Sequence, residues 1–249
     1  MNQIIETILN HRSIRKYEDK PLTDEQIEVI VRSAQAAATS SYVQAYTIIG
    51  IKDKEKKKKL AELAGNQPYV EKNGHLLIFC ADLHRHQLVA EMENVDVSQA
   101  LETTECFMIA LIDAALAAQN AALAAESMGL GICYIGGIRN KLVEVSELLQ
   151  IPIHVIPLFG MTIGYPVHNS DKKPRLPFEH VYHEDTYQSN SSTLKAQLEE
   201  YNKTIKQYYA ERTHGKRQDT WTSQMADKFS EPKRLYMKDY VQNQGFNKK

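Results

Sequence analysis

The sequence contains little cysteine and shows no export signal. Its three cysteines, Cys80, Cys106 and Cys133, are an odd number and form no C-x-x-C pair. This argues against a disulfide framework and fits a reducing compartment. The N-terminal residues lack a basic start followed by an uninterrupted apolar core, so we expect no signal peptide. We therefore expect a cytoplasmic protein.

Several motifs of common enzyme classes are also missing. The sequence has no G-x-x-x-x-G-K-[ST] loop and no G-x-S-x-G turn. In GLGICYIGG (129–137), Tyr134 stands where the third glycine of a dinucleotide motif belongs, and the segment leads into an expected strand rather than out of one. HEDTY (183–187) lacks the second histidine of a zinc helix, and His84 and His86 have no evident partner ligands. We predict neither a metal site nor a catalytic nucleophile.

Long apolar runs and a strong charge imbalance are absent as well. The most apolar stretch is interrupted by Asp113, Gln119, Asn120 and Glu126 and is rich in alanine, so we do not expect a membrane span. The net charge is -1. Residues 1–170 hold 15 Lys and Arg against 20 Asp and Glu, whereas residues 171–249 hold 15 against 11. The mildly basic tail suits a small polyanion better than a nucleic acid.

The apolar pattern predicts a mixture of helices and strands without a regular βαβ rhythm, which indicates an α+β fold. Thr23 and Gln26 form a capping box at a helix start, and Gly65 is a candidate C-cap. We expect helices at 4–11, 23–38, 53–65, 100–128, 139–149, 193–211 and 218–229, and strands at 47–51, 75–83, 131–136 and 157–166.

Three further expectations concern surfaces and domains. The lysine run 56–59 is expected to be a solvated helix face. The helix at 100–128 is apolar on nearly every side, so it should be buried all round, in a core or against a second subunit. We divide the chain into a core, 1–168, and a polar arm, 169–249, that packs on a neighbouring subunit within one overall structural domain.

Three short segments suggest an anion or cofactor pocket. HRSIR (11–15) concentrates basic groups, and YIGG (134–137) allows close approach of the backbone to a flat ligand. KKPRLP (172–177) is a proline-stiffened basic loop. Taken singly, each has an ordinary alternative: a solvated helix end, a strand-end turn and an exposed linker.

The order of these segments resembles a known family. HRSIR is followed by TSSYVQ, GNQPYV, AAESMGLGICYIGGIRN, HVIPLFGMTIGYP, KPRLP and YYAERTHGKRQDTW. This order is similar to that of the FMN-dependent nitroreductase and flavin-reductase superfamily, and within it to the NADPH-linked flavin reductases of bacilli. The resemblance covers essentially the whole chain. It implies a central, mostly antiparallel sheet flanked by helices, an extended C-terminal helical arm, and a homodimer with FMN at the subunit interface.

The resemblance also implies which residues bind the tightly but noncovalently held FMN. His11, Arg12 and Ser13 would line the phosphate and ribityl chain together with Lys173 and Arg175. Arg15 would lie at the pyrimidine edge of the ring and favour the reduced flavin. Ser40 and Ser41 would bond the ring or ribityl, although Ser41 has a simple loop-capping role as an alternative. The remaining expected contacts are Gln67, Pro68, Tyr69, Tyr134, Ile135, Gly136 and Gly137.

The implied activity is an NAD(P)H oxidoreductase that works by a ping-pong cycle without a protein acid or base. Arg212 and Arg217 match positions that meet the 2′-phosphate of NADPH, and Gln218 replaces a frequent further arginine. We expect a modest preference for NADPH with NADH still usable, and flavins, nitroaromatics or quinones as acceptors. A reductase for one dedicated oxidant, a non-catalytic flavin-binding module and a cofactor-free dimeric scaffold remain alternatives.

Overall fold

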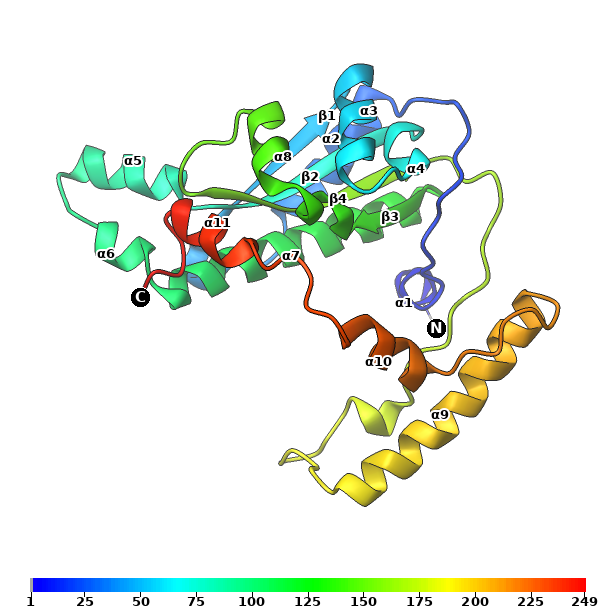
Figure 1. The fold of residues 1–249 in the computed structure, drawn as a ribbon. Helices are drawn as coiled ribbons and strands as arrows, with labels where there is room; N and C mark the ends of the chain where they lie inside the picture. The colour runs from blue at the N-terminus through cyan, green and yellow to red at the C-terminus, as the bar shows by residue number, and fades with distance from the viewer. Residues whose placement is uncertain (1) are drawn as a thin grey trace. The chain divides into compact units, whose positions relative to one another are not determined.

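The computed structural model describes residues 2–249 of the chain, and the contacts divide it into two compact units. The first unit comprises the residues up to 170 together with 234–249, and the second comprises 171–233. The sheet and the helices that cover it belong to the first unit, whereas the second consists of helices and loops (Figure 1).

A four-stranded antiparallel sheet forms the centre of the first unit. Its strands are β1 (Tyr46–Ile51), β2 (His75–Asp82), β3 (Gly131–Ile135) and β4 (Val155–Gly164). They lie in the order β1-β2-β4-β3, so β2 and β4 are internal and β3 lies at an edge. Every residue of β2 is buried, as its uninterrupted apolar run predicts. The predicted α+β fold with an antiparallel sheet is confirmed.

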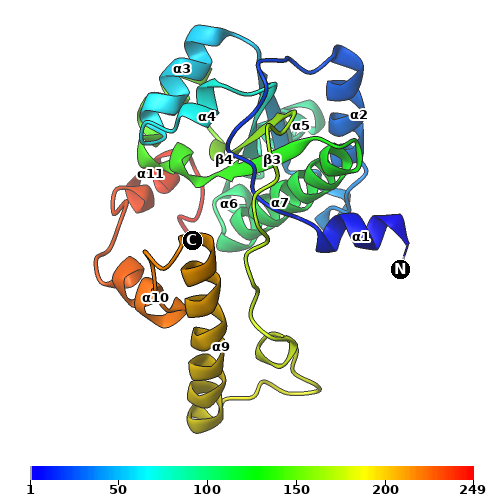
Figure 2. The same ribbon diagram turned by 90° about the vertical axis from the view of Figure 1, so that its right-hand side faces the viewer.

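Five helices cover the two faces of the sheet: α2 (Asp24–Gln35), α3 (Lys54–Leu63), α4 (Pro68–Glu71), α7 (Thr104–Ser127) and α8 (Leu142–Leu149). Successive side chains of a strand point to opposite faces. Leu77 and Phe79 of β2 therefore pack with α2 and the alanines of α7 on one face. Leu76, Ile78 and Cys80 pack with α3, α4 and α8 on the other. Figure 2 shows the sheet between these two layers.

Within this chain the long helix α7 is buried on one side only, so the core supplies part of the expected cover and the second subunit stays a prediction. Ala114 and Ala118 are completely buried against the sheet side. Met108, Ile112 and Leu116 follow one another at a spacing of four residues, so they share a face, and they are 50%, 50% and 42% exposed. The length and hydropathy of α7 would suffice to cross a membrane, but its alanine face packs into the core like that of a globular helix.

Lys57 contradicts the expectation that the lysine run 56–59 is uniformly solvated. Its side chain is only 8% exposed, and its Nζ donates to the backbone oxygen and the Oδ1 of Asn73, at 3.3 and 3.0 Å. Lys57 lies three and four residues before the buried Leu60 and Ala61, so all three share the inner face of α3. A run of identical residues has no periodicity that marks which member points inward.

Helix boundaries follow the capping residues. Thr23 and Gln26 form the predicted capping box of α2. Thr103 caps α7, so the helix predicted from 100 begins at Thr104. The helix predicted from 139 begins at Leu142, after a 3-10 turn. The other elements of this unit are α1 (Gln3–Leu9), η1 (Ser40–Tyr42), α5 (His84–Glu93), α6 (Ser98–Leu101), η2 (Gly136–Asn140) and α11 (Met237–Asn243), of which α5, α6 and α11 were not predicted.

The C-terminal residues 234–249 return to the first unit, although the sequence placed them with the arm. Tyr240 and Phe246 are buried in a cluster with Leu142 and Leu158. The hydroxyl groups of Tyr240 and Ser146 lie 2.5 Å apart. The terminal helix α11 thereby packs on α8 and closes the core at that side.

The second unit has a small core of its own. It contains η3 (Phe178–His180), α9 (Ser191–Arg212) and α10 (Trp221–Phe229), close to the predicted helices 193–211 and 218–229. Tyr201, Ile205 and Tyr209 of α9 are buried together, and Trp221 packs against them. This aromatic cluster joins α9 to α10.

Candidate active site

The HRSIR segment lies along the free edge of the sheet. Ser13 forms a parallel bridge with Ile132 of the edge strand β3, and the backbone N–H of Ile14 donates to the Ile132 oxygen at 2.8 Å. The Ile14 side chain is buried directly over Gly131, where a Cβ atom would lie 2.5 Å from it. A larger residue than glycine at 131 would therefore displace the segment. The sheet edge thus fixes the backbone that carries the predicted phosphate and ring contacts.

His11 and Arg12 lie beside the C-terminal end of α7. The Nδ1 of His11 donates to the Oε1 of Glu126 over 2.7 Å, which fixes the ring orientation. The Nε of Arg12 donates to the backbone oxygen of Asn10 at 3.0 Å. Arg12 and Glu126 line a cavity of about 390 Å³ that Gly131 also borders. The sequence did not predict the role of Glu126, although a carboxylate in an otherwise apolar helix was a signal.

Arg15 meets the Gln67–Tyr69 segment. Its guanidinium lies 5.8 Å from the centre of the Tyr69 ring, and the Tyr69 hydroxyl donates to the Oε1 of Gln67. Burial works to lower the pKa of Arg15, but the Cys133 thiol and the Tyr69 phenol outweigh it, and the net shift is upward. Arg15 is therefore a permanent cation at neutral pH.

The position of the Gln67 amide also explains why residue 137 is a glycine. The Nε2 of Gln67 donates to the Ala64 oxygen at 2.6 Å. A Cβ atom at Gly137 would lie 2.3 Å from this oxygen and 2.6 Å from this Nε2. Pro68 begins helix α4 directly after Gln67. The structure thus brings Gln67, Tyr69, Gly137 and Arg15 together, as the sequence predicted for one site.

The YIGG segment forms the end of β3 and the start of η2. The Tyr134 ring packs edge-on against Phe159 at 5.6 Å, its hydroxyl donates to Gln119 at 3.4 Å, and burial raises its pKa. The Ile135 side chain is 1% exposed in the core, so only its backbone can meet a ligand. A Cβ on Gly136 would lie 3.3 Å from the Arg139 guanidinium.

Ser40 and Ser41 lie in a loop held by a buried carboxylate. Asp113 of α7 is completely buried and accepts from the backbone N–H groups of Ser40, at 2.9 Å, and Ala45, at 3.0 Å. Ser41 has φ 46° and Tyr42 φ 63°, conformations that cost ~1–3 kcal/mol each for residues other than glycine. The sequence did not predict this role of Asp113.

The loop at Ser40 is distant from His11 in the same chain. Their anchors on α7, Asp113 and Glu126, are 13 residues apart. At about 1.5 Å per residue the two anchors are separated by roughly 20 Å along the helix. The structure therefore does not bring Ser40 and Ser41 of one chain together with the HRSIR segment of that chain.

The remaining predicted residues belong to the second unit. The Nη1 of Arg175 donates to the Lys173 oxygen at 3.4 Å, and the Lys173 ammonium lies 5.3 Å from the Tyr209 ring centre. The hydroxyl of Tyr201 donates to the Pro174 oxygen at 2.9 Å, which ties this loop to α9.

The two arginines predicted for NADPH lie at and beyond the end of α9. Arg217 packs over the Tyr209 ring at 4.2 Å, and its Nε donates to Asp219 at 2.7 Å. Arg212 donates to the Tyr208 hydroxyl at 2.7 Å. The sequence did not predict Asp219 as the partner of Arg217. The side chain of Gln218, which stands between Arg217 and Asp219 in the sequence, is exposed.

Within residues 2–249 no group of three or more His, Cys, Asp or Glu side chains is arranged to hold a metal ion.

Comparison with known proteins identifies the family of this chain. The sequence profile of the Nitroreductase family matches residues 8–165, and that of the Nitroreductase family, C-terminal domain, matches 173–249. The chain therefore belongs to the nitroreductase family, and it is an oxidoreductase.

Individual relatives are similar over the full length. The chain is 60% identical over 248 residues to the FMN reductase (NADPH) of Bacillus subtilis, with 100% of both chains covered. The structure of NfrA1 from B. megaterium has 70% identity and a TM-score of 0.98, covering 99% of this chain and 100% of that one. The NADPH:FMN oxidoreductase from Vibrio harveyi complexed with NAD+ has 40% identity and a TM-score of 0.90, with 100% of both chains covered.

Proposed function

We propose that this protein is a cytoplasmic, FMN-containing NAD(P)H oxidoreductase that reduces free flavins, nitroaromatics or quinones. FMN held by these residues would supply the hydride chemistry, and the nicotinamide donor and the acceptor would bind in turn at the same place, which gives a ping-pong cycle. The observation that carries the proposal is the cluster of Arg15, Gln67, Tyr69 and Gly137 beside the sheet edge in a chain of this family. The names of the relatives, FMN reductase (NADPH) and NADPH:FMN oxidoreductase, support the same cofactors.

The donor set fits a flavin mononucleotide. A phosphate monoester carries nearly two negative charges and prefers guanidinium and ammonium donors. Arg12, His11 and Ser13 would hold it, and the family resemblance adds Lys173 and Arg175 as further donors. Arg12 already lines a cavity, and Glu126 orients the His11 ring. The backbone from Tyr134 to Gly137 would lie along the ring, where Gly137 keeps the backbone tight against Ala64.

Arg15 would act on the redox chemistry rather than on binding alone. Reduction places negative charge at the pyrimidine edge of the ring, and a fixed cation there stabilises the reduced more than the oxidised state. A guanidinium stays charged at working pH, and the net shift of the Arg15 pKa is upward. Because the cofactors would supply the hydride chemistry, we assign no residue as a protein acid or base.

We further propose a homodimer with two shared sites. The exposed apolar face of α7, formed by Met108, Ile112 and Leu116, needs a cover that one chain does not give it. The separation of roughly 20 Å along α7 between the anchors of Ser40 and His11 supports a site in which Ser40 and Ser41 serve the flavin of the partner. The polar arm would add to the cover of the partner. Light scattering should give a dimeric mass for the wild type and a monomeric mass for Ile112→Asp.

For the nicotinamide, we propose that Arg212 and Arg217 meet the 2′-phosphate of NADPH. Both lie at the polar end of α9, and Gln218 adds a donor without charge. The pairing of Arg217 with Asp219 offsets part of its charge. This supports a modest preference for NADPH, with NADH still a usable donor.

Steady-state kinetics test the proposed function. A panel of free FMN, a nitrofuran and a quinone is assayed against NADPH and NADH. Parallel double-reciprocal lines and activity with several acceptors are expected. Intersecting lines would contradict the ping-pong cycle. Turnover with only one acceptor would indicate a dedicated reductase, and no turnover with any acceptor would indicate a flavin-binding module.

A further inference from the structure

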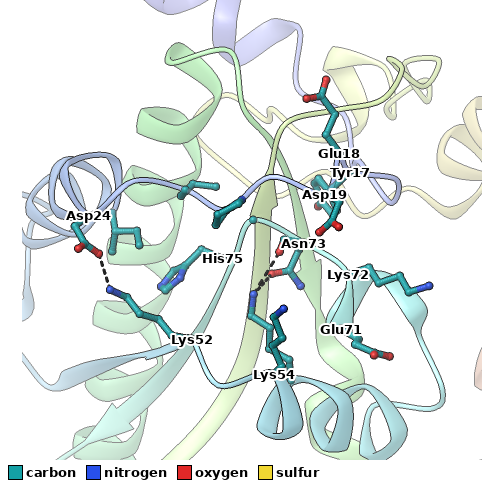
Figure 3. A pocket seen from close by; sticks show the side chains of 15 residues that line it. Tyr17, Glu18, Asp19, Asp24, Lys52, Lys54, Glu71, Lys72, Asn73 and His75 are labelled. Carbon is teal, nitrogen blue, oxygen red and sulfur yellow. Dashed lines mark hydrogen bonds and ion pairs between the residues drawn. The ribbon is translucent and has the colours of Figure 1, made fainter.

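One cavity of the first unit lies apart from the residues proposed to bind the flavin. It has a volume of about 670 Å³ and lies between the segment before α2, the end of β1, the first turn of α3 and the start of β2 (Figure 3). None of the residues proposed to bind FMN or NADPH lines it. Its walls carry Lys52, Lys54, Lys57, Lys72 and His75.

A buried lysine lies at the floor of this cavity and is held in place. Lys57 is 8% exposed, and its ammonium donates to the backbone oxygen and the Oδ1 of Asn73. The Asn73 amide is fixed in turn, because its Nδ2 donates to the Tyr69 oxygen at 3.0 Å and the Val70 oxygen at 2.8 Å. An ammonium has three N–H groups, so Lys57 has one more donor than Asn73 accepts.

A buried histidine stands beside it without a partner. His75 lines the cavity and is only 4% exposed, and its Nε2 has no hydrogen-bond partner within residues 2–249. Leaving a buried polar atom unpaired is unfavourable, and such atoms are rare in folded proteins. This Nε2 is buried and faces Gly50 of β1, where a Cβ atom would lie 3.0 Å from it, so a hydrogen bond from the neutral ring to a ligand in the cavity would come from Nδ1.

The buried positive charge of the cavity is that of Lys57. Burial, and then Lys57 and Lys52, lower the pKa of His75 to about 4, while Asp24 opposes them weakly. Burial and Lys54 lower the pKa of Lys57. His75 is therefore neutral near pH 7, and the cation that a bound anion would stabilise is Lys57, which is destabilised by burial and by the charge of Lys54.

The acidic side chains of the cavity lie at its exposed rim. Asp24 is paired with Lys52 at 2.5 Å, and both are largely exposed. Glu18, Asp19 and Glu71 are exposed as well, and Figure 3 shows them away from the His75 ring. The lining thus carries four lysines and four carboxylates, and within the described residues 2–249 the printed partners of the Lys57 ammonium are the two oxygens of Asn73 rather than a carboxylate.

We propose that this floor binds a small tetrahedral oxyanion, namely phosphate as the free ion or as the phosphoryl group of a small metabolite. Lys57, the His75 ring and the Lys54 ammonium supply the donors. Two charged or polar side chains that are each more than nine-tenths buried make this a built site rather than a surface patch of lysines.

Calorimetric titration of the flavin-loaded protein tests the proposal, because the flavin phosphate then fills the other phosphate site. Inorganic phosphate and glycerol 3-phosphate are titrated at constant ionic strength, with acetate as the non-tetrahedral comparison. Saturable binding of at least one phosphate probe, tighter than that of acetate, is expected. Lys57→Met keeps the length of the side chain and should weaken binding at least tenfold. Lys58→Met, one position along α3 and outside the cavity, should leave binding unchanged.

The His75 ring provides a second readout that does not depend on a substitution. In the wild-type protein, saturating phosphate should raise the pKa of His75 from about 4. NMR of the ring nitrogens measures this titration. Absence of saturable phosphate binding would overturn the proposal. Equal binding by the wild type and Lys57→Met, or binding that leaves the His75 titration unmoved, would place the anion elsewhere and overturn it too.

Discussion

Two cationic regions of the first unit differ in how their charge is balanced. Arg15 lies beside Cys133, Tyr69 and Tyr17, which together raise its pKa although burial opposes them. Lys57 and His75 lie beside Lys54 and Lys52, and burial and these cations lower the pKa of both. The first region thus stabilises a permanent positive charge, whereas the second destabilises positive charge.

This difference indicates two kinds of function. A cation that stays charged can act on a change in charge of its neighbour, as the proposed flavin reduction requires. A buried ammonium such as that of Lys57, destabilised by burial and by Lys54, would be stabilised by an anion, as proposed for the cavity at α3. The predictions below test this comparison in order of decreasing effect.

The largest expected effect is a loss of stability in acid caused by His75. The folded chain holds the pKa of His75 near 4, against 6.5 ordinarily, so between these values the unfolded chain binds more protons. Stability should therefore fall by about 3 kcal/mol as the pH drops from 6.5 to 4. Urea unfolding across this range should show a smaller loss in His75→Gln. His214→Gln, at an exposed position, should behave like the wild type; equal pH slopes in all three would contradict the buried neutral histidine.

The next effect concerns the proposed phosphate contacts of FMN. Arg175→Ala removes a charge-assisted hydrogen bond worth roughly 1.5–3 kcal/mol, so the dissociation constant for FMN should rise at least tenfold. Arg32→Ala, which removes an exposed arginine paired with Glu28, is the matched control. Quenching of flavin fluorescence measures the dissociation constant for FMN in both variants. An unchanged affinity for FMN in Arg175→Ala would indicate that the loop at 172–177 is an exposed linker and not part of the site.

A smaller effect is expected from Arg15→Ala, which should keep much of its FMN. Because Arg15 faces charge that appears on reduction, the midpoint potential of the bound flavin should fall, by on the order of 30 mV for tenfold weaker stabilisation of the reduced state, and reduction should slow. Spectroelectrochemistry with Arg32→Ala as control measures the shift. If the potential stays or rises, Arg15 belongs with the phosphate contacts.

The smallest effect is expected at the exposed end of α9. Arg212→Ala and Arg217→Ala should raise the KM for NADPH severalfold and that for NADH less, and salt should narrow the gap. Asp219→Asn frees Arg217 and should lower the KM for NADPH about twofold. Lys216→Ala, the exposed neighbour, is the control. Equal changes with both donors would show that this loop contacts the part of the molecule that the two cofactors share.

Features that depend only on residues close together in the sequence were predictable. The capping box of Thr23 and Gln26, the buried strand β2 and the alanine-rich helix α7 each follow from spacing or composition within one segment. The HRSIR, YIGG and KPRLP segments became candidates because their order resembles a family. The short helices α5, α6 and α11 lack a strong apolar period, so they left no comparable signal.

Features that depend on distant residues were not predictable from one sequence. His11 and Glu126 are 115 residues apart, and Ser40 and Asp113 are 73 apart. The burial of Lys57 depends on where α3 packs and on Asn73, neither of which a run of lysines encodes. The parts of the site that could not be predicted are therefore those that depend on contacts between side chains far apart in the sequence.

The central claim is that this chain holds a flavin and passes electrons through it. The most direct measurement is the visible spectrum of the purified protein under anaerobic conditions while NADPH is added. The account predicts a flavin spectrum that bleaches on addition of NADPH and returns when free FMN or a quinone is supplied. A protein without flavin absorbance, or one whose bound flavin stays oxidised with excess NADPH and NADH, would contradict it.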